Sequence, residues 1–388
     1  MRDGSRRNRS PETIAASYGV ASDVAYGAIS PPIYLSSTFE FEQFEIPRPY
    51  DYGRVGNPSR DLLGETLARL EGGAGSVITS SGMSAVDLLL GQMKPGGHVI
   101  APHDCYGGTM RLLKARSARC GFAVDFVDQS NDVDLYSALK SETSLILVES
   151  PSNPLMRVVD IAKVVELART VEAAVAVDNT FLSPALQQPL ALGADYVIHS
   201  TTKFLNGHSD VIGGAVVAAN ADRALELRAW ANVVGSIGAP FDAWLTLRGM
   251  RTLFPRMERQ QRTAMQLANW LLEHSAVKGV NYPGLPSNPY HALAARQQKG
   301  FGAMLSFELA DGVEAVKAFL DRLQIFTLAE SLGGIESLVS HPATMTHVDM
   351  GEDARRSVGI SNSLVRLSVG LEDAEELVAD LADGLRDP

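Results

Sequence analysis

Seven short apolar segments separated by helical stretches constrain the fold of this chain more than any other feature. They cover residues 76–79, 98–101, 122–127, 145–148, 174–177, 196–198 and 215–218. Strands that alternate with helices predict a mostly parallel sheet covered by helices on both faces. The clearest helix is predicted over residues 160–169, where apolar residues recur at helical spacing and Asp160 can cap the N-terminus.

Regions of different character flank this alternating segment. Residues 1–60 are rich in proline and lack strong periodicity, which predicts an extended N-terminal arm. We expect a large α/β domain over residues 61–255 and a smaller C-terminal α+β domain over residues 256–388. Within the smaller domain the pattern predicts a strand at 303–309 and a last helix at 373–385. A long helix at about 255–274 is expected to connect the two domains.

Composition excludes several classes of protein. The formal net charge is −11, and no apolar run is long enough to span a bilayer or to serve as a secretory signal. Cys105 and Cys120 are too few for a disulfide framework or a zinc site. We therefore expect a cytoplasmic protein that binds neither nucleic acid nor membrane, without a bound metal. One basic cluster is expected to be a solvated chain end: Arg2, Arg6, Arg7 and Arg9.

Unusual residues follow four of the predicted strands, at the edge where open α/β sheets bind ligands. They are residues 81–83, 149–153, 178–180 and 199–203. The small turn 80–84 can direct backbone N–H groups at an anion, although an ordinary turn with a serine cap has the same pattern. Asp178 could keep a pyridine nitrogen protonated or could cap a turn. Lys203 follows the hydroxyl residues 200–202 and suits an imine bond, although a lone lysine is normally solvated. Together these residues make pyridoxal 5′-phosphate (PLP) the leading cofactor.

Several motifs, in the same order along the chain, are similar to those of a known family, the Cys/Met-metabolism PLP enzymes of fold type I. They lie at residues 52–58, 104–108, 149–154, 177–181, 199–210, 327–334 and 365–368. Motifs that recur in order are far more specific than any one motif. The resemblance implies the PLP-dependent transferase fold of type I, with a mostly parallel central sheet and a smaller C-terminal domain.

The same resemblance implies a role for each matched residue around the cofactor. Lys203 would be the Schiff-base lysine and proton shuttle, and Asp178 would pair with the pyridinium. Tyr106 would stack on the ring and could assist proton transfer at the leaving group, while Asn153 would orient the ring hydroxyl. The phosphate-binding residues would be Gly82, Met83, Ser200 and Thr202.

The resemblance further implies a shared active site. Tyr52 and Arg54 would reach the phosphate of a neighbouring subunit, so the chain would form an obligate oligomer, in this family usually a tetramer of two dimers. Gly53 stands between them where the family usually has serine, which makes the loop more flexible. Arg366 would bind the substrate α-carboxylate through its planar guanidinium.

Other residues bear on the subclass within the family. The stretches 101–108, 149–161 and 294–302 are most similar to the bacterial cystathionine γ-synthases. Glu330 stands where γ-directed members carry an acid, which argues against a β-lyase without separating synthase from lyase. The remaining substrate-facing positions would be Asp51, Arg111 and Ser331.

Arg111 has two interpretations: it could hold the distal carboxylate of a succinyl group or of cystathionine, or it could be a solvated helix residue. His103 and Cys105 are expected to pack rather than to catalyse. The resemblance predicts γ-replacement of the acyl group of O-acylated homoserine, with succinyl favoured over acetyl, by cysteine to give cystathionine. The alternatives are a cystathionine γ-lyase, an O-acylhomoserine sulfhydrylase and, from another class, a non-catalytic α/β binding module.

Overall fold

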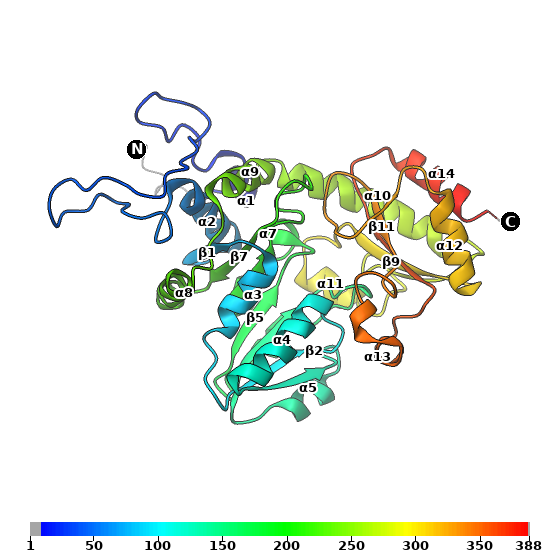
Figure 1. Ribbon diagram of the computed structural model, residues 1–388. Coiled ribbons are helices and arrows are strands. Elements are labelled where there is room, and N and C mark those ends of the chain that lie inside the picture. The colour runs from blue at the N-terminus through cyan, green and yellow to red at the C-terminus, as the bar shows by residue number, and fades with distance from the viewer. Residues whose placement is uncertain (1–8, 387–388) are drawn as a thin grey trace.

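The computed structural model describes residues 9–386, which form two sheets connected by a long helix (Figure 1). Arg2, Arg6 and Arg7 of the basic cluster lie outside the described residues. The larger sheet contains β1 (Gly75–Thr79), β2 (His98–Pro102), β3 (Ala123–Val127), β4 (Thr143–Glu149), β5 (Ala174–Asp178), β6 (Tyr196–Ser200) and β7 (Gly214–Ala218). All seven predicted apolar segments are therefore strands.

The strand order of the larger sheet is β1-β7-β6-β5-β4-β2-β3. The β6, β5, β4, β2 and β3 strands pair in parallel, and β7 runs antiparallel to both β1 and β6. The prediction of a mostly parallel sheet is confirmed. Because the central strands are parallel, their carboxyl ends meet at one edge of the sheet.

Alternating residues of each central strand pack against helices on opposite faces. On one face, Leu147 of β4 belongs to the same apolar cluster as residues of α3 (Gly82–Leu90), α4 (Gly107–Cys120) and α8 (Ala221–Val234). On the other face, Val148 packs with α5 (Asp132–Ala138) and α6 (Ile161–Arg169). Asp160 caps α6 as predicted, and its Oδ1 accepts a hydrogen bond from the Lys163 N–H at 3.2 Å.

Further helices enclose the β1 end of the same second face. They are α2 (Pro58–Glu71), α7 (Ser183–Leu186), the 3-10 helix η2 (Pro189–Leu192) and α9 (Pro240–Met250). Within residues 9–386, no helix is both long enough and apolar enough to cross a membrane.

The smaller sheet lies beyond helix α10 (Leu253–Glu273). Its order is β10-β11-β12-β9-β8, and all its pairs are antiparallel except β10 with β11. The strands are β8 (Val277–Asn281), β9 (Met304–Leu309), β10 (Thr327–Leu328), β11 (Leu338–Ser340) and β12 (Leu364–Ser368). The helices are α11 (His291–Gln297), α12 (Gly312–Arg322), η3 (Val348–Met350), α13 (Glu352–Ser357) and α14 (Ala374–Gly384). The predicted long helix, internal strand and last helix are confirmed.

One apolar core is common to both sheets. It joins Val217 of β7 and Leu67 of α2 to Leu267 of α10, Phe307 of β9 and Leu381 of α14, all of them fully buried. The expected boundary between residues 255 and 256 falls in the first turn of α10, and the division into domains at that point stays a proposal.

The N-terminal arm has little regular structure and projects away from both sheets (Figure 1). Helix α1 (Pro11–Ser17), which begins with a Ser10 cap and proline in its first turn, departs from the expectation of an extended arm. Residues 18–57 contain two isolated bridges and no helix. Large apolar side chains lie in water here: Val24, Tyr26 and Phe44 are 88%, 94% and 90% exposed. Such a surface in one chain is typical of a region that another chain covers.

Candidate functional site

The carboxyl ends of β4, β5 and β6 place polar residues on one face of the larger sheet. Glu149 and Asp178 are register partners, and Asp178 is opposite Ile198, so Ser200 two residues later lies on the same face. Helices α3 and α4 cover this face, and residues of both N-termini reach the same cavity. The cavity has a volume of about 910 Å³.

The cavity brings together all the predicted site residues except Asp51, Tyr52 and Arg54. Its lining includes Gly82, Met83, Tyr106, Arg111, Asn153, Asp178, Ser200, Thr202, Lys203, Glu330, Ser331 and Arg366. They come from both sheets, from helices α3 and α4, and from loops. The cofactor and substrate roles of the individual residues stay predictions, but their gathering in one cavity is a property of the fold.

Lys203 is placed to act as a nucleophile and a base. Its Nζ donates a hydrogen bond to Ser331 Oγ at 2.8 Å. Removal from water and the charge of Arg366 lower the pKa of Lys203 to about 8, against the opposing effect of Glu330. The amine is therefore neutral in a useful fraction of molecules near neutral pH. Ser331 holds a left-handed φ of 99°, a sparsely populated conformation of the kind that clusters at functional sites.

Two carboxylates lie side by side at the base of the cavity. Removal from water raises the pKa of Asp178, although its carboxylate accepts a hydrogen bond from the Thr180 N–H at 3.0 Å. Burial, together with the negative charge of Asp178, raises the pKa of Glu149 to about 8. A cationic group such as a protonated pyridine nitrogen would relieve this accumulation of negative charge.

The N-terminus of α3 and two hydroxyl residues form a site suited to a phosphate. A Cβ at Gly82 would lie 2.8 Å from the Ser200 Cβ, so the close approach of this turn to β6 requires glycine. Ser81 Oγ caps the helix by accepting from the Ser84 N–H at 3.1 Å, which confirms the capping interpretation of the turn. Ser200 and Thr202 also line the cavity here. A helix N-terminus with neighbouring hydroxyls favours an anion.

Arg366 provides a buried cation with unused hydrogen-bonding capacity. It donates to Asn153 Oδ1 at 2.8 Å and to the Ser331 carbonyl oxygen at 2.9 Å. Its Nε is buried and has no hydrogen-bond partner among residues 9–386. Burial lowers the pKa of Arg366 to about 10, so the guanidinium is charged at neutral pH. A carboxylate ligand would satisfy the free N–H group.

Arg111 occupies the exposed side of the cavity and forms an ion pair with Asp349 of η3. Both side chains are 57% exposed, and an ion pair in such contact with water is weak. Arg111 is therefore a solvated helix residue that also lines the cavity, and its binding of a distal carboxylate stays a prediction.

The three predicted residues of the arm lie outside this cavity. Arg54 lines a separate cavity of about 430 Å³ together with Arg60 and Arg228. Asp51 Oδ1 accepts from the Tyr52 N–H at 2.6 Å. The expected role of Tyr52 and Arg54 in the site of a neighbouring subunit stays a prediction. The role of Asp51 stays a prediction.

Two cavity residues to which the motifs assigned no role are Glu149 and Thr180. Thr180 Oγ1 accepts from the Ser200 N–H at 2.9 Å and the Thr180 N–H donates to Asp178, so it connects β5 to β6. Both residues stand at or just beyond the ends of predicted strands. The sequence placed both residues at that edge but did not assign them a role.

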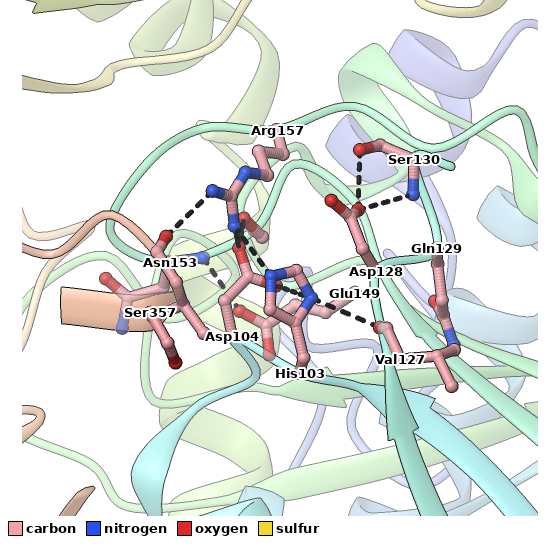
Figure 2. A network of polar contacts seen from close by, with 12 residues as sticks. His103, Asp104, Val127, Asp128, Gln129, Ser130, Glu149, Asn153, Arg157 and Ser357 are labelled. Carbon is pink, nitrogen blue, oxygen red and sulfur yellow. Dashed lines mark hydrogen bonds and ion pairs between the residues drawn. The ribbon is translucent and has the colours of Figure 1, made fainter. Parts of the chain in front are cut away.

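A polar network supports the loops on the β4 side of the cavity (Figure 2). Asp104 Oδ2 accepts from Ser152 Oγ and from an Arg157 Nη, both at 2.8 Å. Arg157 also contacts His103 Nε2 at 3.2 Å and donates to the Val358 carbonyl oxygen at 2.7 Å. Cys105 is buried, and neither Cys105 nor His103 lines the cavity. The expectation that these two residues pack rather than catalyse agrees with this arrangement.

The residues present fit PLP. The α3 N-terminus with its hydroxyls would hold the phosphate, Asp178 the ring nitrogen and Lys203 the aldehyde carbon. The free N–H group of Arg366 would remain for a substrate carboxylate. No observation at the site conflicts with this assignment.

Comparisons with known proteins agree with this fit. A family model described as Cys/Met metabolism PLP-dependent enzyme matches residues 12–386. The chain is 55% identical to cystathionine gamma-synthase of Escherichia coli (strain K12), over 97% of this chain and 98% of that enzyme. A cystathionine beta-lyase of Lactococcus lactis subsp. cremoris is 45% identical over 95% of this chain and 96% of its own length.

A solved structure extends the likeness to three dimensions. Cystathionine gamma synthase from Xanthomonas oryzae pv. oryzae, in complex with cystathionine, has a TM-score of 0.96 and 55% identity. The match covers 97% of this chain and 98% of that one. The fold, the site and the whole-length similarity lead to one conclusion: this chain is a member of the Cys/Met metabolism PLP-dependent enzyme family.

Proposed function

We propose that this enzyme is a cystathionine γ-synthase, which joins O-succinyl-L-homoserine to L-cysteine to give L-cystathionine and succinate. The observation that carries the proposal is the pair of arginines in the cavity wall, Arg366 buried and Arg111 exposed. O-Succinyl-homoserine has two carboxylates, one on the α-carbon and one at the succinyl end. The 55% identity to enzymes with this name supports the choice.

The chain's own residues supply binding and proton transfer. When bound, PLP supplies an electron-accepting ring that stabilises negative charge next to the substrate α-carbon. Asp178 would keep the proton on the ring nitrogen, and Arg366 would hold the α-carboxylate. The Lys203 amine, neutral in part because its pKa is about 8, would take the protons from the α- and β-carbons.

The overall reaction replaces one bond of the substrate γ-carbon with another. Its bond to the succinyl oxygen breaks, and succinate leaves with the bonding electrons. The cysteine sulfur forms the new bond and its thiol proton is released. Lys203 would return protons to the substrate as the product forms. Glu330 lines the cavity and opposes the lowering of the Lys203 pKa, so it is placed near the lysine during these transfers.

A cystathionine γ-lyase would use the same residues, because breakdown of cystathionine shares the early proton transfers. An O-acylhomoserine sulfhydrylase would differ in taking sulfide instead of cysteine. The carboxylate of Glu330 at the cavity argues against a β-lyase. Product analysis separates these activities.

We further propose a homotetramer of two dimers in which the arm of one subunit completes the cavity of its neighbour. The exposed apolar residues of the arm and the position of Arg54 outside its own chain's cavity support this. O-Acetyl-homoserine stays the alternative acyl donor, and a cytoplasmic location stays a prediction.

The test is to incubate the PLP-loaded enzyme with O-succinyl-homoserine and cysteine and, separately, with cystathionine alone. We expect cystathionine and succinate in the first mixture and little breakdown in the second. Rapid formation of cysteine and 2-oxobutyrate from cystathionine, with poor use of the succinyl ester, would instead identify a γ-lyase.

A further inference from the structure

Glu149 is a buried carboxylate at the cavity to which the proposed reaction assigns no role. It ends β4, is 8% exposed and lies beside Asp178 in the sheet register. A buried carboxylate is costly unless its oxygens are hydrogen-bonded, so its partners indicate what it does.

Each oxygen of Glu149 accepts a backbone N–H group from a different loop. Oε2 accepts from the Tyr106 N–H at 3.0 Å, and Oε1 accepts from the Asn153 N–H at 2.9 Å. Tyr106 is the residue before α4, and its side chain makes no capping hydrogen bond. Glu149 therefore fixes the backbone of the two residues that are predicted to stack on the ring and to orient its hydroxyl group.

A second hydrogen bond joins the loop before α4 directly to the loop after β4. Asp104, two residues before Tyr106, accepts from Ser152 Oγ, one residue before Asn153. Asn153 in turn holds Arg366 through its side-chain oxygen. Glu149 thus lies at the junction of the stacking residue, the hydroxyl-orienting residue and the carboxylate-binding arginine.

We propose that Glu149 is a positioning residue, whose carboxylate holds Tyr106 and Asn153 in the geometry that binds the PLP ring. This inference rests on the proposed cofactor site. Glutamate suits the position because both of its oxygens can accept, in the ionised form and in the protonated form that its raised pKa favours near neutral pH. Glutamine has one acceptor and would turn its NH₂ group toward a second N–H donor. Glu149→Gln keeps the size of the side chain and removes one of the two hydrogen bonds.

Asp195 offers a matched control at the other end of the parallel strands, next to the amino end of β6. It is also buried and accepts a backbone N–H, from Val175 at 2.8 Å, together with Arg169 at 2.9 Å. Val175 lies near the amino end of β5, away from the cavity. Asp195→Asn therefore tests the cost of altering a buried, hydrogen-bonded carboxylate without touching the site.

The experiment measures the Kd of each apoprotein for PLP by fluorescence titration, the visible circular dichroism per bound PLP, and Tm. For Glu149→Gln we expect a Kd about 10-fold higher and a weaker dichroic band, because the ring is less firmly held. Asp195→Asn should lower Tm and leave both cofactor readouts unchanged. Glu149→Asp, which keeps both acceptors on a shorter side chain, should be intermediate and provides a second variant if the glutamine form does not fold.

Unchanged Kd and dichroism in Glu149→Gln would overturn the inference, as would equal changes in the Asp195 control. A wild-type protein that binds no PLP would overturn the proposed function and this inference together. Wild-type binding with an unaffected Glu149 variant would overturn this inference alone.

Discussion

The cavity and the N-terminal arm contrast within the same chain. In the cavity, functional side chains from both sheets hold one another, as when Ser331 accepts from both Lys203 and Arg366. In the arm, residues 18–57 have no helix, and large apolar side chains are almost fully exposed. The cavity is formed by contacts within one chain, whereas the arm lacks the contacts that would bury its apolar surface.

This difference separates two parts of the proposed active site. Lys203, Asp178 and Arg366 are brought together by folding of a single chain. Tyr52 and Arg54 are not, so their predicted phosphate contacts depend on a second copy. Changes in the cavity should therefore act within each subunit, and changes in the arm should act on a neighbour.

The largest effect is expected from Lys203→Ala. Loss of the amine removes both the covalent attachment and the proton shuttle, so kcat should fall by about 10³-fold or more. PLP could still bind without a covalent bond. Steady-state kinetics on the PLP-saturated variant provide the measurement, and near-normal turnover would contradict the role of Lys203.

Mixing subunits tests whether the arm acts on its neighbour. Arg54→Ala should raise the Kd for PLP by about 10-fold, because a charge-assisted contact to phosphate is lost. When Lys203→Ala and Arg54→Ala subunits are dissociated and reassembled together at limiting PLP, activity should exceed that of either variant alone. In a mixed dimer, one site would have both an intact lysine and an intact arm.

No gain of activity on mixing, with hybrid oligomers demonstrated by mass spectrometry, would place the Arg54 contact within one subunit. That result would contradict the proposal that cavity residues act within their own subunit while arm residues act on a neighbour.

The pH dependence of PLP incorporation tests the lowered pKa of Lys203 in the cavity. The pKa of Lys203 is lowered from 10.5 to about 8, so the neutral amine increases as pH rises toward 8 and levels off above it. The rate of PLP incorporation into the apoenzyme should rise about 50-fold between about pH 6 and pH 8 and then reach a plateau. A rate that still rises tenfold per unit near pH 9 would show a lysine in an ordinary, solvated environment.

The smallest effect is expected at the exposed side of the cavity. Arg111→Ala should raise KM for O-succinyl-homoserine by about 5-fold, since half-exposed charge pairs are weak. KM for O-acetyl-homoserine, which lacks the distal carboxylate, should change less than about twofold. Equal changes for both substrates would leave Arg111 as a solvated helix residue.

Much of the fold could be predicted because hydrophobic periodicity is local. The strand over 145–148 and the helix capped by Asp160 depend on residues close together in the chain. The antiparallel direction of β7 depends on its pairing with β1 and β6, which lie far from each other in sequence. Helix α1 depends on a local Ser10 and Pro11 signal that the proline-rich composition of the arm obscured.

The candidate site was partly predictable for a similar reason. Residues at strand ends, such as Asp178, can be placed from the pattern of strands alone. The role of Glu149 could not be, because it depends on which backbone N–H groups the folded loops direct at its oxygens. The ion pair of Arg111 with Asp349 likewise joins segments far apart in sequence and required the folded chain.

The central claim is that this cavity holds PLP on Lys203. The most direct test is to reduce the PLP-loaded enzyme with borohydride, digest it and locate the pyridoxyl group by mass spectrometry. We predict a single stoichiometric label on the peptide that contains Lys203. A label on another lysine, or no label on an enzyme that still binds PLP and catalyses the reaction, would contradict the account.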